Sequence, residues 1–199
     1  MGKPGIVQIA GTGSITYGIN HNKEMDRVGG WGHFAGERGS GYALGRDALE
    51  AAFSAYDALG QATELTNLIQ QHFQVERLPD IIHPVYHAEN SKEIIAGLGK
   101  LVMEAADQHD PAAKTIIHTN AAHIGKSISC LINKLFQDSA QDQIIPVVLT
   151  GGVFNRLDLF RETIEAEITS HNHLVKMNIP EIEPAEGALI AAMLEAEEL

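Results

Sequence analysis

The first thirty residues limit the fold of this chain more than any other feature, because they hold three short strand-like segments joined by tight turns. Residues 5–10 are an apolar run, residues 14–20 form a second candidate strand, and residues 24–28 form a third. Strands that follow one another so closely pair as an antiparallel meander. The rest of the chain must therefore be arranged around a sheet that is built at its start.

Helical periodicity follows the meander. Apolar residues recur at helical spacing from Tyr42 to Leu59, with Gly60 as the expected C-cap. Further helices are expected over residues 64–73, 91–110 and 111–137, the first capped by Thr63 and the last begun by Asp110 and Pro111.

The pattern changes again after the long helix. Residues 144–150 are a short apolar run typical of a buried parallel strand, and it ends at a Gly-Gly pair. A helix over 153–169, a strand over 173–179 and a closing helix over 184–198 are expected to follow. This order predicts one α/β domain over residues 1–199, with a mixed sheet of three antiparallel and two further strands flanked by helices.

Charge and cysteine content exclude some classes of function. The formal net charge is -12, which disfavours nucleic acid as a partner because phosphate neutralisation needs clustered Lys and Arg. No apolar run is long enough to suggest a membrane span or a signal peptide, so we expect a cytoplasmic protein without a membrane partner. The single cysteine, Cys130, cannot form an internal disulfide, and its apolar neighbourhood predicts a small buried side chain.

Two of the expected strands end in glycine turns. The first is GTGS, Gly11 to Ser14, where backbone N–H groups and two hydroxyls can cradle phosphate oxygens. On this motif alone a simple hairpin is favoured over a phosphate loop. The second is TGGVFN, Thr150 to Asn155, which fits close approach of a flat ligand and tight strand-to-helix packing equally well.

The stretch GGWGHFAGERGSGY, residues 29–42, holds six glycines around the only tryptophan of the chain. Ordering glycine costs more backbone entropy than ordering any other residue, so such a cluster indicates sharp turns or close contact. Trp31 and Glu37 could contact a sugar through the aromatic face and the carboxylate oxygens. Alternatively, Trp31 fills an edge of the core and Glu37 pairs with Arg38 or Arg46 at the surface.

Taken together, these motifs resemble a known family. IAGTGS, GGWGHFAGERGSGYALGRDAL, TGGVF and PAEGALIAAM, in this order, resemble the BadF/BadG/BcrA/BcrD ATPase family and its N-acetylglucosamine kinase-like members, within the actin-like ATPase and sugar kinase superfamily. The resemblance implies a ribonuclease H-like fold, ATP and Mg²⁺ as cofactors, and phosphoryl transfer to a hydroxyl of an amino sugar.

The resemblance also implies roles for particular residues. The phosphate-contacting turn is Gly11, Thr12, Gly13 and Ser14, the adenosine-contacting residues are Gly151, Gly152 and Val153, and the sugar-contacting residues are Gly30, Trp31, Gly32 and Glu37. It implies no catalytic residue and no metal ligand within this chain.

Two departures from the family pattern stand out. The usual GDEGS is here Gly36-Glu37-Arg38-Gly39-Ser40, which moves the carboxylate by one methylene and reverses a charge. Family members also begin with a lobe that carries a DGGGT-like phosphate loop and an aspartate general base. We expect both to be absent here, so that the chain corresponds to the C-terminal lobe, has little or no kinase activity alone, and forms a homodimer or joins a separate N-terminal lobe.

Other functions stay open at this point. A non-catalytic module that binds a sugar or a nucleotide fits the departures from the family pattern. The electron-activating branch of the family needs cysteines for an iron–sulfur cluster, and a lone Cys130 argues against it.

Overall fold

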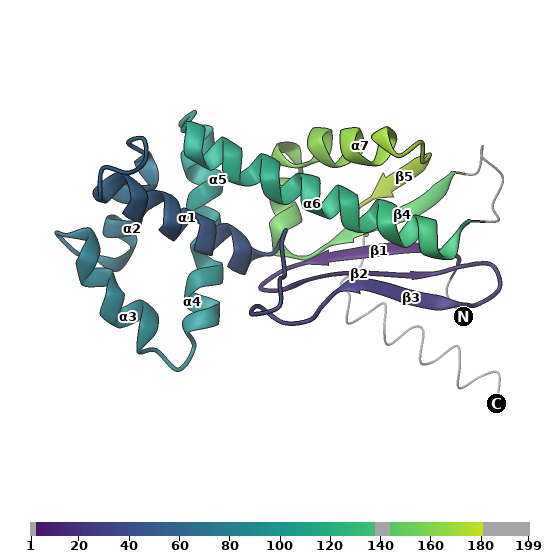
Figure 1. The fold of residues 1–199 in the computed structure, drawn as a ribbon, viewed down its shortest axis with the longest axis horizontal. Coiled ribbons are helices and arrows are strands. Elements are labelled where there is room, and N and C mark those ends of the chain that lie inside the picture. The colour runs from purple at the N-terminus through teal and green to yellow at the C-terminus, as the bar shows by residue number, and fades with distance from the viewer. Residues whose placement is uncertain (1–2, 138–143, 181–199) are drawn as a thin grey trace.

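The computed structural model describes residues 3–137 and 144–180, and the closing helix expected over 184–198 lies outside them. The strands, in chain order, are β1 (Gly5–Ala10), β2 (Ser14–Ile19), β3 (Met25–Gly29), β4 (Ile145–Thr150) and β5 (Val175–Asn178). The helices are α1 (Gly41–Tyr56), α2 (Glu64–Phe73), the 3₁₀ helix η1 (Leu78–Ile81), α3 (Ile82–Tyr86), α4 (Ser91–Gly97), α5 (Gly99–Asp107), α6 (Pro111–Leu135), the 3₁₀ helix η2 (Gly152–Leu159) and α7 (Arg161–Ser170) (Figure 1).

The strands form one sheet in the order β3-β2-β1-β4-β5. β1, β2 and β3 pair antiparallel, whereas β4 pairs parallel with both β1 and β5. The meander and the two additional strands predicted from the sequence are therefore confirmed.

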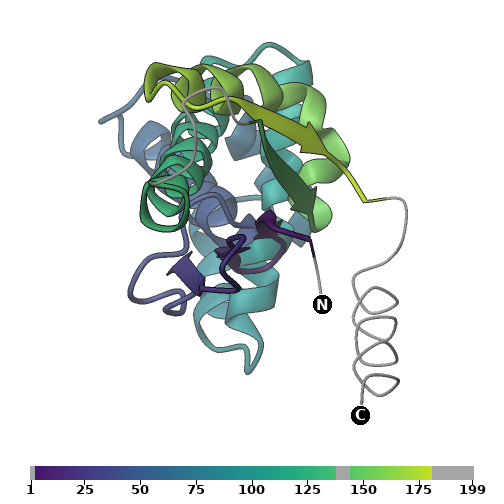
Figure 2. The same cartoon turned by 90° about the vertical axis from the view of Figure 1, so that its right-hand side faces the viewer.

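One face of the sheet is covered by the long helix. Ile6, Gln8 and Ala10 alternate along β1 and are buried, as period-two patterning requires of a strand that packs on one side. Figure 2 shows α6 and α7 together over the same face of the twisted sheet. At Gly18 in β2 a Cβ atom would lie 2.9 Å from the side chain of Leu135, so α6 approaches the strand closely there.

The helices α1 to α5 gather at one end of the sheet (Figure 1). Asp110 ties this end together, because its carboxylate accepts hydrogen bonds from the backbone N–H of Ala113 at 2.8 Å, the hydroxyl of Thr63 at 2.9 Å and the backbone N–H of Glu64 at 2.7 Å. The predicted N-caps at Thr63 and Asp110 are thus confirmed, and they are bonded to each other.

Several local expectations were wrong. The first helix ends at Tyr56, and Ala58, with φ 58°, takes the left-handed conformation that was expected at Gly60. The helix expected over 91–110 is broken at Leu98 into α4 and α5, and the helix expected over 153–169 is a kinked 3₁₀ segment followed by α7.

Cys130 is exposed rather than buried. It lies beside the buried stripe of α6 and not in it, although its sequence neighbours are apolar.

Within the described ranges, every helix is too short or too polar to cross a membrane.

Candidate functional site

The turn after β1 is a three-residue hairpin connection, as its strand–GxG–strand pattern indicates. Ala10 pairs with Ser14 across it, and Gly11 donates its backbone N–H to the carbonyl oxygen of Gly13 over 2.9 Å. The side-chain amide of Gln8 donates to the Ser14 hydroxyl at 3.0 Å. The Ser14 hydroxyl hydrogen therefore stays available to another acceptor.

The turn after β4 lies beside the turn after β1. Ile9 pairs with Thr150 in parallel register, so both strands end at the same edge of the sheet. Gly151, with φ 106°, rests on the backbone of Ala10, whose carbonyl oxygen a Cβ atom at position 151 would overlap. Tight packing thus accounts for Gly151. It does not account for Gly152, where a Cβ atom would meet nothing within 4 Å.

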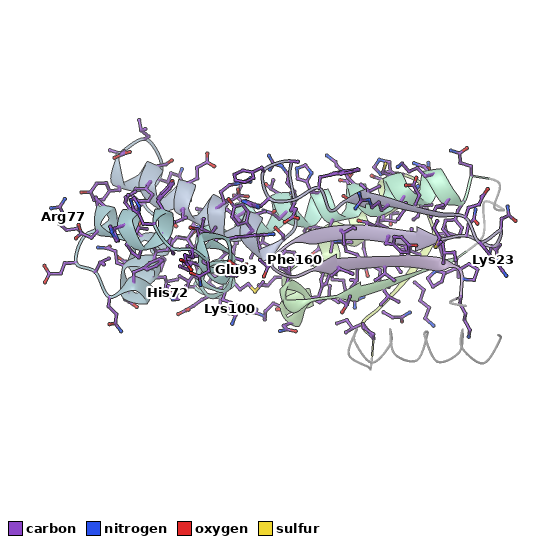
Figure 3. The ribbon with its side chains drawn as sticks, turned by 90° about the horizontal axis from the view of Figure 1, so that it is seen from below. Lys23, His72, Arg77, Glu93, Lys100 and Phe160 are labelled. Atoms are coloured by element: carbon purple, nitrogen blue, oxygen red, sulfur yellow. The ribbon has the colours of Figure 1, made fainter. Side chains whose placement is uncertain are left out.

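Both turns border a cavity of about 470 Å³ between the sheet and the helices, a volume typical of small-molecule sites. Its walls come from the GTGS turn, the start of α1, the α4–α5 junction and the start of η2. Glu93 of α4 and Lys100 of α5 both line the cavity, and Figure 3 labels them on the two helices of this junction.

Only some of the residues predicted to contact the nucleotide line this cavity. Gly11, Thr12, Gly152 and Val153 line it, whereas Gly13, Ser14 and Gly151 belong to the same turns without lining it.

At three glycines in the cavity wall, the packing of the protein itself leaves room for a side chain. At Gly11, Gly97 and Gly152 a Cβ atom would meet nothing within 4 Å, and none of the three has a positive φ. Gly41 and Gly99 differ, because a Cβ atom there would lie 3.1 Å from the Gly11 carbonyl oxygen and 3.2 Å from the Gly41 carbonyl oxygen. The three open glycines let a ligand approach the backbone directly.

An ion-pair cluster joins η2 to α5 next to Asn155, which lines the cavity. Arg156 in η2 contacts Asp107 of α5 at 2.8 Å and Asp158 at 2.9 Å. Hydrogen bonds from this guanidinium hold the pKa of both carboxyl groups below their usual range, and the two carboxylates raise the pKa of Arg156. The neighbouring residue Asn155, which lines the cavity, is thereby kept close to α5.

The glycine-rich loop between β3 and α1 begins and ends on the GTGS turn. Gly30 donates its backbone N–H to the Ser14 carbonyl oxygen at 3.2 Å. At the other end, Gly41 donates to Gly11 at 2.7 Å and Tyr42 donates to Thr12 at 3.2 Å. The loop and the turn therefore form one hydrogen-bonded unit, which the spacing of the two motifs in the sequence does not reveal.

Trp31 lies at the surface of this loop. Its side chain is 67% exposed, and the Arg27 guanidinium lies 4.3 Å from the ring centroid. The alternative that Trp31 fills an edge of the core is therefore wrong. Its flanking glycines, Gly30 and Gly32, have φ values of 72° and 90°.

Glu37 points inward instead of toward solvent. Its side chain is 8% exposed, and its carboxylate lies against Gly13, where a Cβ atom would come within 2.8 Å of Oε2. The ion-pair partner of Glu37 is Lys92 of α4, with Nζ 3.6 Å from Oε2. The surface pair with Arg38 or Arg46 is not formed, and Arg46 contacts Asp47 at 2.6 Å.

The sequence reasoning missed the contribution of the α4–α5 junction to the site. Gly97, Gly99 and Lys100 line the cavity, and Lys92 reaches the loop from the same helix pair. The available signal was the glycine pair itself, because two glycines within one helical turn weaken a helix and mark a possible break. The described residues contain no cluster of three or more His, Cys, Asp or Glu side chains that could hold a metal ion.

Two kinases are similar to this chain in sequence. The N-acetylmuramic acid/N-acetylglucosamine kinase of Clostridium acetobutylicum is 31% identical over 195 residues, which cover 98% of this chain and 63% of the kinase. The N-acetyl-D-glucosamine kinase of Dictyostelium discoideum is 30% identical over 190 residues, which cover 95% of this chain and 59% of the kinase. The chain thus spans about three fifths of the length of these relatives.

Two crystal structures share the fold. A candidate N-acetylglucosamine kinase from Chromobacterium violaceum has a TM-score of 0.71 at 24% identity, over 95% of this chain and 59% of its own. A second candidate N-acetylglucosamine kinase, from Porphyromonas gingivalis, has a TM-score of 0.63 at 21% identity, over 94% of this chain and 59% of its own.

The pattern of the BadF/BadG/BcrA/BcrD ATPase family matches residues 1–192. The chain belongs to the BadF/BadG/BcrA/BcrD ATPase family.

Proposed function

We propose that this chain forms the nucleotide-binding part of an ATP-dependent kinase of N-acetylglucosamine or a related amino sugar. The observation that carries this proposal is the set of three open glycines, Gly11, Gly97 and Gly152, around the cavity where the two glycine turns meet. The two similar kinases support an amino sugar as the phosphoryl acceptor.

In this proposal ATP lies across the two turns. Thr12, Gly13 and Ser14 contact the phosphates through backbone N–H groups and hydroxyls. Gly11 opens the turn, and its own N–H bonds to the Gly13 carbonyl oxygen, so it contributes by leaving room for the phosphates. Gly151, Gly152 and Val153 contact the adenosine. The free Ser14 hydroxyl hydrogen and the missing side chain at Gly152 support this orientation.

Mg²⁺ fits the site only when it is bound together with the nucleotide. Mg²⁺ keeps several waters and binds through one or two carboxylates together with substrate phosphates. Glu37 places a single carboxylate at the phosphate turn, next to Gly13. When bound, Mg²⁺-ATP supplies the phosphoryl group, and the residues of this chain orient it.

The sugar is proposed to lie on the glycine-rich loop, in contact with Gly30, Trp31, Gly32 and Glu37. The exposed indole of Trp31 offers an aromatic face to a sugar ring, and the loop is fixed to the phosphate turn by backbone hydrogen bonds. Such a connection would bring the acceptor hydroxyl close to the phosphates.

The proposal includes a second lobe. Because the chain covers about three fifths of the two similar kinases, we expect the complete cleft to need further residues and the chain alone to transfer little or no phosphoryl group. The proposal also includes a ribonuclease H-like sheet and a cytoplasmic location. The chain is proposed to associate with an N-terminal lobe or with a second copy of itself.

One observation favours a second candidate, a module that binds a nucleotide without catalysis. Glu37 is buried against Gly13 and paired with Lys92, so its carboxylate is not turned toward the loop surface where Trp31 lies.

Calorimetric titration with N-acetylglucosamine and, separately, with Mg-ATP distinguishes these functions. The kinase proposal predicts binding of both ligands, loss of sugar binding in Trp31→Ala and Glu37→Ala, and a blue shift of Trp31 fluorescence with the sugar. Nucleotide binding without sugar binding would favour the non-catalytic module. If neither ligand binds at millimolar concentration, the proposal is wrong for this chain.

A further inference from the structure

The carboxylate of Glu37 is an unusual group to find beneath a phosphate turn. Its side chain is more than nine-tenths buried, and Oε2 has no hydrogen-bond partner among the described residues. A buried carboxylate without hydrogen bonds is costly unless a cation lies close by. The cation here is Lys92, which contributes the only ion pair of Glu37 within the described part of the chain.

Lys92 is held loosely. Its Nζ lies 3.6 Å from Oε2, beyond the range of about 2.7–3.2 Å in which an N–H group forms a hydrogen bond to oxygen. The ammonium group therefore keeps its three donors, and its long flexible stem lets it move to a new acceptor. A third of the side chain is exposed, so a ligand can reach it.

The pair lies beside Gly13, one of the residues to which the proposed function assigns the phosphates. The Glu37 carboxylate contacts Gly13 in the middle of the turn, and Lys92 approaches that carboxylate from α4. Figure 1 shows α4 facing the loop that joins β3 to α1. A phosphate at Gly13 would face the carboxylate, and repulsion between like charges would oppose binding unless a cation is shared between them.

We propose that Lys92 is a phosphate-binding residue that Glu37 holds in place until the nucleotide arrives. When a phosphate reaches the turn, the Lys92 ammonium moves from Oε2 of Glu37 to a phosphate oxygen and forms charge-assisted hydrogen bonds with it. This inference rests on the proposed nucleotide site, and it adds to that site a binding residue from a helix outside the glycine motifs.

The test is calorimetric titration of the full chain with pyrophosphate, ADP and adenosine. Lys92→Met is expected to weaken pyrophosphate and ADP binding by at least about tenfold, the effect of losing one charge-assisted hydrogen bond. Adenosine affinity is expected to stay unchanged, because adenosine has no phosphate. Lys92→Arg is expected to retain most of the phosphate affinity, and Glu37→Gln to increase it.

Lys134→Met is the matched control. Lys134 also pairs with a carboxylate, Asp26 at 3.0 Å, but on α6 beside β3, so this variant makes the same change in net charge without touching Lys92. Equal loss of phosphate affinity in Lys92→Met and Lys134→Met would show a general charge effect and overturn the inference. Unchanged ADP affinity in Lys92→Met would overturn the inference and leave the nucleotide site standing. Failure of the unmodified chain to bind ADP, pyrophosphate and adenosine would overturn both.

Discussion

The side-chain oxygen Oδ1 of Asn120, in the middle of α6, accepts a hydrogen bond of 2.8 Å from the backbone N–H of Gly39. This bond joins the long helix to the glycine-rich loop across 81 positions of sequence. The Asn120 side-chain amide also donates to Asp47 at 3.0 Å and to the Ile116 carbonyl oxygen at 3.0 Å, so its orientation is fixed. The position of the loop therefore depends on a fully buried residue that lies outside every glycine motif.

Asn120→Ala is expected to lower the free energy of unfolding by about 2 kcal/mol, because the buried N–H of Gly39 loses its acceptor. The amide protons of the loop are expected to exchange faster with solvent. Asn133→Ala, on the exposed side of the same helix, is the control and should change stability by less than about 0.5 kcal/mol. Urea denaturation and hydrogen exchange measure both effects, and equal behaviour of the two variants would contradict this role of Asn120.

The crossing of α1 over the α4–α5 junction depends on a glycine. At Gly45 a Cβ atom would overlap the backbone carbonyl oxygen of Ile95, which a side-chain rotation cannot relieve. Gly45→Ala is expected to destabilise the fold by about 3 kcal/mol, despite the better helix propensity of alanine.

Gly97→Ala is the matched control for this crossing. A Cβ atom there meets nothing within 4 Å, so the substitution should leave stability unchanged or raise it by up to about 1 kcal/mol. Thermal unfolding of the two variants would contradict the account if Gly97→Ala were the more damaging of the two.

Among the helices that the structure describes, Asp110 is expected to be the most important cap. Asp110→Ala removes the acceptor of three hydrogen bonds that join the starts of α2 and α6, and should cost about 3 kcal/mol. Asp57→Ala, at the exposed end of α1, should cost less than about 0.5 kcal/mol. Guanidinium denaturation of both variants gives the comparison, and a small effect at Asp110 would show that the cap is replaceable.

The chain is expected to lose folding stability in mild acid because of two histidines, His123 and His173. Burial, followed by the charges of Arg38 and Lys126, lowers the pKa of His123, and burial followed by His171 lowers the pKa of His173. Below their ordinary value of 6.5 the unfolded chain takes up these protons more readily than the folded chain. The contribution of these two histidines to the free energy of unfolding is therefore fully present above pH 6.5. It is lost as the pH drops toward their lowered pKa values in the folded chain.

Replacing both histidines by glutamine should flatten this dependence. Urea midpoints measured between about pH 7.5 and 5 are expected to fall for the unmodified chain and to fall less for the double variant. Parallel curves would show that other groups titrate in this range.

The sheet and the caps could be predicted from the sequence because local chemistry determines them. Short strand-like segments joined by tight turns predicted the meander, and an Asp-Pro pair marked the start of α6. Helix ends were less predictable. Gly60 was the obvious C-cap by residue type, but the chain turns already at Ala58 and the N–H groups of Leu59 and Gly60 both return to the Ser54 carbonyl oxygen.

The site was only partly predictable for a similar reason. The glycine turns stand out by composition, whereas Lys92, Asn120 and the break at Leu98 take part through contacts between segments far apart in the sequence. The sequence predicts that Glu37 contacts the sugar, which stays a prediction, whereas its inward orientation against Gly13 follows from the packing of the loop on the turn.

The measurement that tests the central claim most directly is ADP binding by Gly152→Val, followed by calorimetry. The new side chain enters open space in the cavity wall, so thermal stability should be unchanged while ADP affinity falls by at least about tenfold. Ala166→Val, exposed on α7, is the control and should bind ADP like the unmodified chain. If Gly152→Val folds normally and binds ADP with unchanged affinity, the cavity between the two glycine turns is not the nucleotide site.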